Sequence, residues 1–227
     1  MGAITRGLAN NITTAGRIAA SGVNDATVSA ITSLAIGATD NTYHLVSSQT
    51  ASSSASISFT SGLDSTYDVY VFRFINIHPE TDGKNFEVDF STDGGSNYNL
   101  NKQTVFFQAY HDEADVGGNE DVAYNSSGDL QNTTGGANLT RFTGNDNDQS
   151  LEGEMFLFNP SDTTFVKHFK GRCMASANVN MHQGEFLAGY VNTTSAINAV
   201  KFSFNSGDID SGTIKLYGVR DVSISGI

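Results

Sequence analysis

The chain of 227 residues has one cysteine, two prolines, no tryptophan and no long apolar run. A single cysteine, Cys173, excludes a disulfide framework within the chain and a multi-cysteine zinc site. No apolar run approaches the roughly 18 residues of a membrane-spanning helix. The first residues also lack the continuous apolar core of a secretory signal. We therefore expect no membrane partner and no secretory leader.

Positive charge is also scarce. The chain has 12 Lys and Arg against 24 Asp and Glu, a formal net charge of −12, and no run of cations. Proteins that bind nucleic acids neutralise phosphates with clustered Lys and Arg. We therefore expect no nucleic-acid partner. The acidity is typical of proteins that stay soluble on a crowded exterior surface.

Aromatic and small polar residues are abundant, a composition typical of short strands and polar turns. The clearest strand pattern lies between Ser54 and Asn76. There Ala55, Ile57 and Phe59 alternate with serines, which predicts a strand with one wet face. The segment from Tyr67 to Ile75 is apolar on both registers, which predicts a central strand covered on both faces.

The alternating segments together predict the fold class. Pro79 should close the strand that precedes it, because proline cannot donate to a strand ladder. Strand patterns at these intervals, with no convincing helix, predict an all-β protein, an antiparallel two-sheet β-sandwich that is jelly-roll-like, with an extended N-terminal arm. We predict one or two further short strands in the polar interval 112–148, and strands at 43–49, 55–59, 67–75, 86–90, 104–110, 151–158, 163–173, 185–191, 197–204 and 213–219, of which 151–158 and 163–173 form a hairpin.

The N-terminal region differs from the rest of the chain. Residues 1–37 are rich in Ala, Thr, Ser and Gly and contain no aromatic residue, so they cannot build a core alone. We therefore divide the chain into residues 1–40, a docking arm that becomes ordered on a partner, and residues 41–227, the β-sandwich domain. The alternative is a frayed terminus. The partner-binding residues we expect in the arm are Ile4, Arg6, Leu8, Ile12, Arg17 and Ile18.

Candidate metal ligands are dispersed. None of the histidines has a partner at a metal-ligand spacing; they are His44, His78, His111, His168 and His182. The most suggestive cluster places Asp112, Glu113 and Asp115 beside His111, and it could bind a hard cation or act as acid and base. The alternative is a solvated acidic loop. We therefore expect no metal and no cofactor.

A second acidic segment resembles the start of a calcium loop. Asp146 and Asp148 fit the first ligand positions, but Leu151 and Leu157 stand where an EF-hand requires glycine and the closing glutamate. Two alternatives remain for this segment. One is a calcium site of another type, with Asp146, Asp148 and backbone carbonyls as ligands, and the other is an Asx-rich turn.

Catalytic motifs are missing. The serines lack a GxSxG elbow, no glycine-rich phosphate loop is present, and no carboxylate pair stands out among the acidic residues. We therefore expect that the chain is not an enzyme. The aromatic residues Tyr98, Tyr110 and Tyr124 could stack on sugars, and the alternative for each is packing at the rim of a strand.

Four segments resemble a family of virion structural proteins of tailed phages that infect marine bacteria and cyanobacteria. They are MGAITRGLANNITTAG at 1–16, ASISFTSGLDSTYDVYVFRFINIHP at 55–79, MFLFNPSDTTFVKHF at 155–169 and GTIKLYGV at 212–219. The resemblance implies a jelly-roll-like domain on the particle exterior, attached through its N-terminal segment. It implies no catalytic residue.

Two hypotheses of function follow. The first is a surface-displayed head decoration or fibre-type appendage of a phage particle, homo-oligomeric, whose arm docks on major capsid or tail proteins. The second is a tail module that binds a host surface glycan or receptor through the loops of residues 112–148. A polysaccharide-degrading enzyme is a third reading, and we expect it least because no catalytic set stands out.

Overall fold

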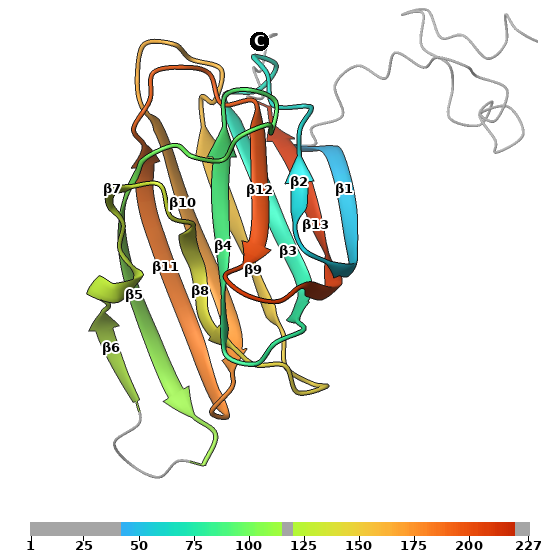
Figure 1. Cartoon of the computed structure of the whole chain (residues 1–227), viewed down its shortest axis with the longest axis vertical. Helices are drawn as coiled ribbons and strands as arrows, with labels where there is room; N and C mark the ends of the chain where they lie inside the picture. Colours follow the sequence, from blue (N-terminus) through green and yellow to red (C-terminus); the bar gives the residue numbers. More distant parts are fainter. Residues whose placement is uncertain (1–41, 115–119, 221–227) are drawn as a thin grey trace, which may run out of the picture. The chain divides into compact units, whose positions relative to one another are not determined.

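The computed structural model describes residues 42–114 and 120–220 (Figure 1). In these ranges the chain forms β-strands and one short 3-10 turn, Ser126–Gly128, and no α-helix. Outside the described residues lie Asp115 and the predicted arm, residues 1–40, with Ile4, Arg6, Leu8, Ile12, Arg17 and Ile18.

The strands follow the chain in this order: β1 (Tyr43–Ser54), β2 (Ile57–Phe59), β3 (Val69–Pro79), β4 (Lys84–Ser91), β5 (Lys102–Asp112), β6 (Glu120–Tyr124), β7 (Gln131–Thr133), β8 (Ala137–Thr143), β9 (Leu151–Phe158), β10 (Lys167–Ala177), β11 (Met181–Val191), β12 (Ala199–Phe204) and β13 (Ile209–Val219).

Every strand pairing is antiparallel, so the predicted all-β antiparallel class is confirmed. Nine strands form one path, β1-β13-β3-β9-β10-β8-β4-β12-β2, while β11, β5, β6 and β7 continue from β10 as a branch. The path nearly closes, because β1 and β2 are consecutive and Gln49 Nε2 donates to the Ser58 carbonyl at 2.8 Å. Figure 1 shows β2, β12, β4 and β8 lying over the other strands.

The structure differs from a plain two-sheet sandwich in one respect. The pairing of Ala177 with Thr143 joins β10 to β8, so the two facing layers belong to one hydrogen-bonded sheet that folds over itself. The interval 112–148 holds three strands rather than one or two. Their patterns are weak because β6 and β7 are exposed edge strands that pair only with β5, and because β8 carries Asn138, Thr140 and Thr143 among its buried residues.

The strand predictions are otherwise close to the structure. The hairpin of β9 and β10 is present, and β3 ends at Pro79 as expected. Strand β3 is central, between β13 and β9. The expectation that both of its faces are covered holds only in part: on the second register Val71 is buried, whereas Arg73 and Ile75 are exposed. The second face of β3 is therefore covered at Val71 and open from Arg73 to Ile75.

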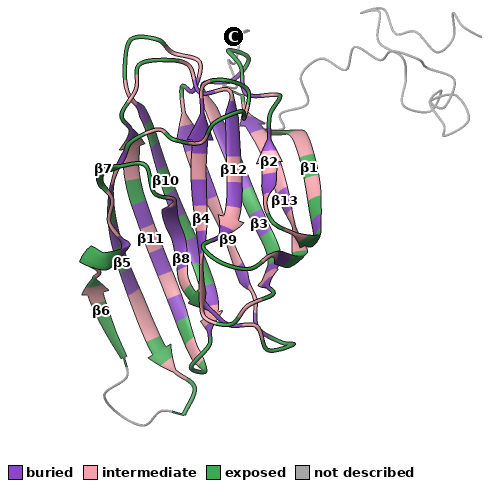
Figure 2. Cartoon of the chain, viewed as in Figure 1, coloured by how far each residue is buried: buried purple, intermediate pink, exposed green. Residues whose placement is uncertain are grey.

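Inward and outward side chains alternate strictly along β10, where every second residue from Lys167 to Ala177 is buried. Figure 2 shows the same alternation as bands along β10 and β11. The inward residues form the core between the two layers. At its centre Phe202 of β12 lies 5.0 Å from Phe72 and 5.2 Å from Phe74, ring centre to ring centre, with edge-to-face geometry. Such aromatic contacts add to the free energy gained by burial.

Replacement of Phe202 by alanine should lower the free energy of unfolding by about 3–5 kcal/mol, because it opens a cavity among rings that cannot collapse onto one another. Urea denaturation measures this loss. Phe165, which is 71 % exposed, provides the control, and Phe165→Ala should change stability by less than about 0.5 kcal/mol. Equal losses in the two variants would contradict the assignment of the core.

Candidate functional site

A cleft of about 570 Å³ lies on the inner side of the branch formed by β5 and β11. Its walls include Gln108 and Tyr110 from β5, Gln183 from β11, Phe142 near the end of β8, and Asn178 from the turn between β10 and β11. We call this site the polar cleft. No Asp, Glu, Lys or Arg lines it within the described part of the chain.

Strand alternation turns the two glutamines of the polar cleft inward. In the register of β5 and β11, Gln108 lies opposite Glu185, and Gln183 lies opposite Tyr110. Both glutamines are buried, and the Oε1 atom of each has no hydrogen-bond partner. The Nε2 atom of Gln183 reaches only the Met181 sulfur, at 3.8 Å. A buried polar atom without a partner costs about 1–3 kcal/mol, so this arrangement requires an explanation.

Three further polar groups lie near the glutamines on β11 and β8. Glu185 Oε1 accepts the backbone N–H of Arg141 at 2.9 Å, while Glu185 Oε2, Arg141 Nε and Asn138 Oδ1 are buried without partners. Burial raises the pKa of Glu185 to about 8. This carboxyl is therefore protonated and uncharged near neutral pH. Five of the seven unpartnered buried side-chain atoms in the described ranges belong to β5, β8 and β11.

The raised pKa of Glu185 predicts a pH-dependent stability. In the folded chain the Glu185 carboxyl stays protonated up to about pH 8, whereas in the unfolded chain it loses its proton near pH 4.5. The contribution is therefore fully present below pH 4.5 and is lost as the pH rises to about 8. Glu185→Gln removes the titration, so the variant should be more stable than the wild type at pH 8 by on the order of a few kcal/mol, and nearly equal to it at pH 4.5.

Thermal unfolding of both proteins across this pH range measures the effect. Burial also raises the pKa of Glu87, to about 7, but Glu87 titrates in both proteins and cancels in their difference. A constant difference in melting temperature from pH 4.5 to pH 8 would show that Glu185 keeps an ordinary pKa.

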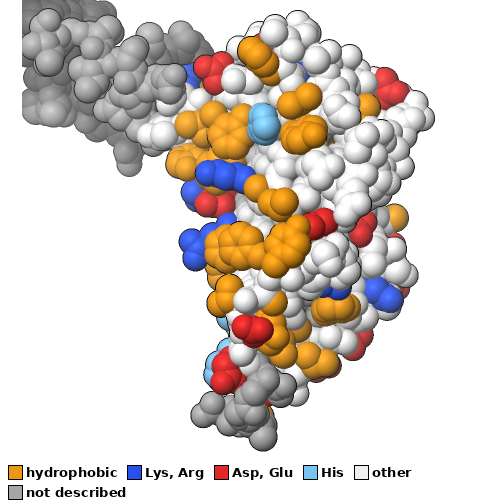
Figure 3. All heavy atoms as spheres, turned by 90° about the vertical axis from the view of Figure 1, so that its left-hand side faces the viewer, with side chains coloured by type: hydrophobic (Ala, Val, Ile, Leu, Met, Phe, Trp, Pro, Cys, Tyr) orange, Lys and Arg blue, Asp and Glu red, His pale blue; other side chains and the backbone are white. Residues whose placement is uncertain are grey.

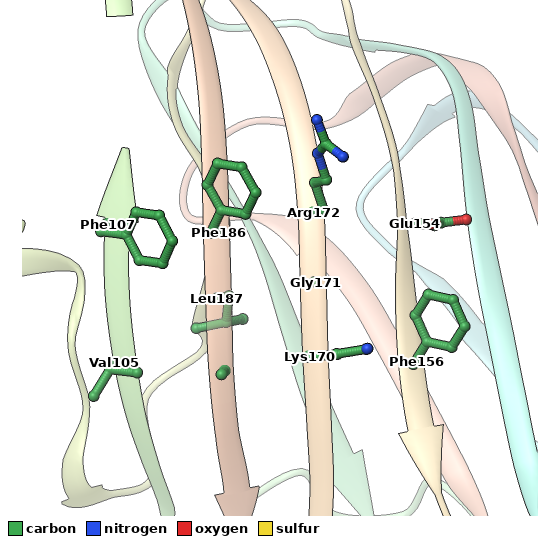
Figure 4. Close-up of a pocket in the computed structure, with 10 residues that line it drawn as sticks. Val105, Phe107, Glu154, Phe156, Lys170, Gly171, Arg172, Phe186 and Leu187 are labelled. Atoms are coloured by element: carbon green, nitrogen blue, oxygen red, sulfur yellow. The ribbon is translucent and has the colours of Figure 1, made fainter. Parts of the chain in front are cut away.

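The opposite side of the large layer carries exposed aromatic and cationic side chains. We call it the outer face, the side of β5, β11, β10 and β9 turned away from the core. On it Phe107 and Phe186 stack with ring centres 4.7 Å apart and planes 5° apart. The guanidinium of Arg172 lies 5.4 Å from the Phe186 ring, and Lys170 Nζ lies 5.1 Å from the ring of Phe156 (Figure 4).

Two hollows mark the outer face. Each has a volume of about 420 Å³, and both are lined by Val105, Lys170 and Ala188. The second extends toward His168 and Tyr190. Figure 3, which turns the left-hand side of Figure 1 toward the viewer, shows hydrophobic side chains beside Lys and Arg side chains. Together the two hollows cover parts of β5, β9, β10 and β11.

Strand register continues the outer face beyond the hollows. It aligns Phe107, Phe186, Arg172, Glu154 and Arg73 in one row across five strands. Arg73 lies 3.9 Å from the Glu154 carboxylate, with its guanidinium 4.9 Å from a tyrosine ring of β1. Among the described residues, Lys170 and Arg172 form no salt bridge.

The sequence-predicted aromatic residues have three different outcomes. Tyr110 lines the polar cleft. Tyr124 is exposed on β6, and its hydroxyl donates to the carboxylate of Asp129. Tyr98 lies under Lys201, 4.8 Å from its Nζ, and its hydroxyl is buried, as expected for packing at a rim.

The structure describes the residues of the two predicted acidic clusters except Asp115. In residues 42–114 and 120–220 no group of three His, Cys, Asp or Glu side chains could hold a metal ion. His111 Nδ1 lies 2.6 Å from the carbonyl oxygen of its neighbour Asp112, and Glu113 is exposed. In the other segment, the backbone N–H of Gln149 donates to the Asp146 carbonyl, which closes a turn, and Asp148 is exposed.

The remaining histidines have separate surroundings. His44 Nδ1 is 2.9 Å from the Tyr67 hydroxyl, and His78 is 3.6 Å from the Asp210 carboxylate. His168 and His182 are exposed on β10 and β11. In the register of β5 and β11, His182 lies opposite His111, whereas the other three histidines lie on other strands.

We did not predict the glutamines of the polar cleft or the cations of the outer face from the sequence. A period-2 signal was available for the cations, since Lys170 and Arg172 alternate with buried residues. No local signal identifies Gln108 and Gln183 as neighbours, because strand pairing alone brings β5 beside β11.

No helix in the described ranges is long and apolar enough to cross a membrane. Comparison with protein-family models, curated proteins and solved structures finds no match to the chain.

Proposed function

We propose that the chain is a non-enzymatic structural component of a phage particle, a head decoration or fibre-type appendage displayed on the exterior. The resemblance of its sequence to phage virion proteins supports this role. In this proposal residues 1–40 dock on major capsid or tail proteins, and the folded-over antiparallel sheet is a jelly-roll-like domain.

The outer face is the observation that carries the proposal. Stacked phenylalanines, unpaired cations and hollows resemble the composition of protein–protein contacts, in which aromatic residues and arginine are enriched. The outer face therefore supports a role in assembly with another protein surface.

Charge complementarity favours another copy of this chain as the occupant. Outward and exposed residues of β3, β9, β10 and β13 include the cations Arg73, Lys170, Arg172 and Lys215 and the acids Glu152, Glu154 and Asp210, an excess of one positive charge, whereas the whole chain has a formal net charge of −12. Two such faces would repel each other, so a face-to-face dimer is disfavoured. An acidic surface of a neighbouring copy is complementary, and head-to-tail contacts of this kind generate rings or filaments.

Reversal of the two unpaired cations tests this contact. Lys170→Glu combined with Arg172→Glu should weaken self-association about tenfold or more, because it places carboxylates against an acidic partner. Sedimentation velocity over a range of protein and salt concentrations measures the association. The control is Lys84→Glu on β4, which reverses one charge in the other layer and so makes half of the change in net charge. A wild type that stays monomeric, or equal association of wild type and double variant, would contradict the proposal.

Deletion of residues 1–37 tests the arm. The truncated chain should keep the far-ultraviolet circular dichroism spectrum and cooperative unfolding of the β domain, because the core residues lie between β1 and β13. It should fail to join particles, because the docking arm is missing. Mass spectrometry of purified particles measures incorporation. Particles that contain the truncated protein at the wild-type level would exclude a docking arm.

A second candidate function, a tail module that binds a host surface glycan, is favoured by the polar cleft. Phe142 and Asn125, from the interval 112–148 that we predicted to form the contact surface, both line the cleft.

A further inference from the structure

We infer that the polar cleft is a binding site for a neutral saccharide. Its two buried glutamines present unpartnered amide oxygens, and aromatic rings stand beside them. This inference is independent of the assembly role proposed for the outer face, because the two surfaces lie on opposite sides of β5 and β11.

Hydrogen bonding defines what the ligand must supply. The Oε1 atoms of Gln108 and Gln183 accept hydrogen bonds, and no described group donates to them. A ligand that satisfies both must carry at least two donors. Sugar hydroxyls donate and accept, whereas a carboxylate or phosphate ester lacks a proton to donate.

Charge excludes an ionic ligand as the best fit. No Asp, Glu, Lys or Arg lines the polar cleft in the described part of the chain, so a bound ion would touch no charged side chain there. The nearby carboxyl of Glu185 accepts one backbone hydrogen bond and is fully buried. A neutral, hydroxyl-rich ligand avoids the cost of burying a charge without a partner.

Aromatic side chains supply the apolar part of the site. Tyr110 and Phe142 line the cleft, and the Phe142 ring is held from one side by the guanidinium of Arg141, at 4.6 Å. Phe142 is 42 % exposed and adopts a left-handed backbone conformation with φ of 55°. That conformation is costly for a bulky residue and is found mainly at functional positions. A ring held in this way offers a platform for the C–H face of a sugar.

The size of the cleft fits this class of ligand. At about 570 Å³ it falls in the usual range for small-molecule sites. Ordered waters could also satisfy the two amide oxygens, and sugar hydroxyls would replace such waters at similar positions. A binding measurement separates the two cases.

Saturation-transfer NMR with the full chain tests the inference directly. The probes are methyl glycosides of glucose, galactose and mannose, and N-acetylglucosamine. We expect saturable binding of at least one, with the strongest transfer to the ring C–H protons that contact Tyr110 or Phe142. A purified bacterial exopolysaccharide added in competition distinguishes a free sugar from a residue of a polymer.

Two glutamine variants assign the site. Gln108→Leu and Gln183→Leu remove the amide at nearly constant volume, so each should weaken binding at least about tenfold. Each should also leave the melting temperature unchanged or raise it, because a buried unpartnered group is lost. The control is Gln103→Leu, the same substitution on β5 at an outward position, which should bind normally. Phe142→Ala provides a further variant whose ring is too exposed to support the core, and it should also weaken binding.

Three results would overturn the inference: no saturable binding of any probe to the wild type, normal affinity in both Gln108→Leu and Gln183→Leu, or an equal loss of affinity in Gln103→Leu. If a glutamine variant does not fold, normal binding by Phe142→Ala overturns it.

Discussion

Strict alternation of side chains along a sheet that folds over itself is the constraint on which the rest of the structure depends. It sends Phe72, Phe74 and Phe202 into one aromatic core, while Arg73 and Ile75 of the other register of β3 are exposed. Because β5 and β11 continue as a branch beyond β10, the alternation also creates two surfaces there. One is the polar cleft on the inner side, and the other is the outer face.

Some buried polar groups of the fold have hydrogen-bond partners and others do not. Lys102 and Lys167 are buried on β5 and β10, yet both are satisfied. Lys102 Nζ donates to Asp89 at 2.7 Å, and Lys167 Nζ donates to the Phe165 carbonyl at 2.6 Å. The fold therefore provides partners for these two ammonium groups, whose isolation would be very costly. The oxygens of Gln108 and Gln183 are among the buried atoms left without a partner, and the proposed ligand would satisfy them.

The outer face has a different physical character. Its cations lie against aromatic rings rather than carboxylates, as Lys170 does against Phe156 and Arg172 against Phe186. Cation–π contacts position the side chains but leave the positive charge available to a partner. In the proposed self-association, the cations of the outer face would favour an acidic surface of the neighbouring copy. The two surfaces thus separate a proposed contact between proteins from a proposed contact with a ligand.

The sequence by itself determined the strand class, most strand positions, the end of β3 at Pro79 and the hairpin of β9 and β10, because these depend on local alternation and on proline chemistry. It also indicated Tyr110 as a residue that could stack on sugars, but it did not predict which residues surround Tyr110. Only the tertiary structure decided that Gln108 and Gln183 line one cleft, that β10 joins the two layers through Ala177 and Thr143, and that Arg73 and Ile75 on the outer register of β3 stay exposed. The reason is physical: alternation assigns a residue to a face, but pairing between distant strands decides which residues share that face.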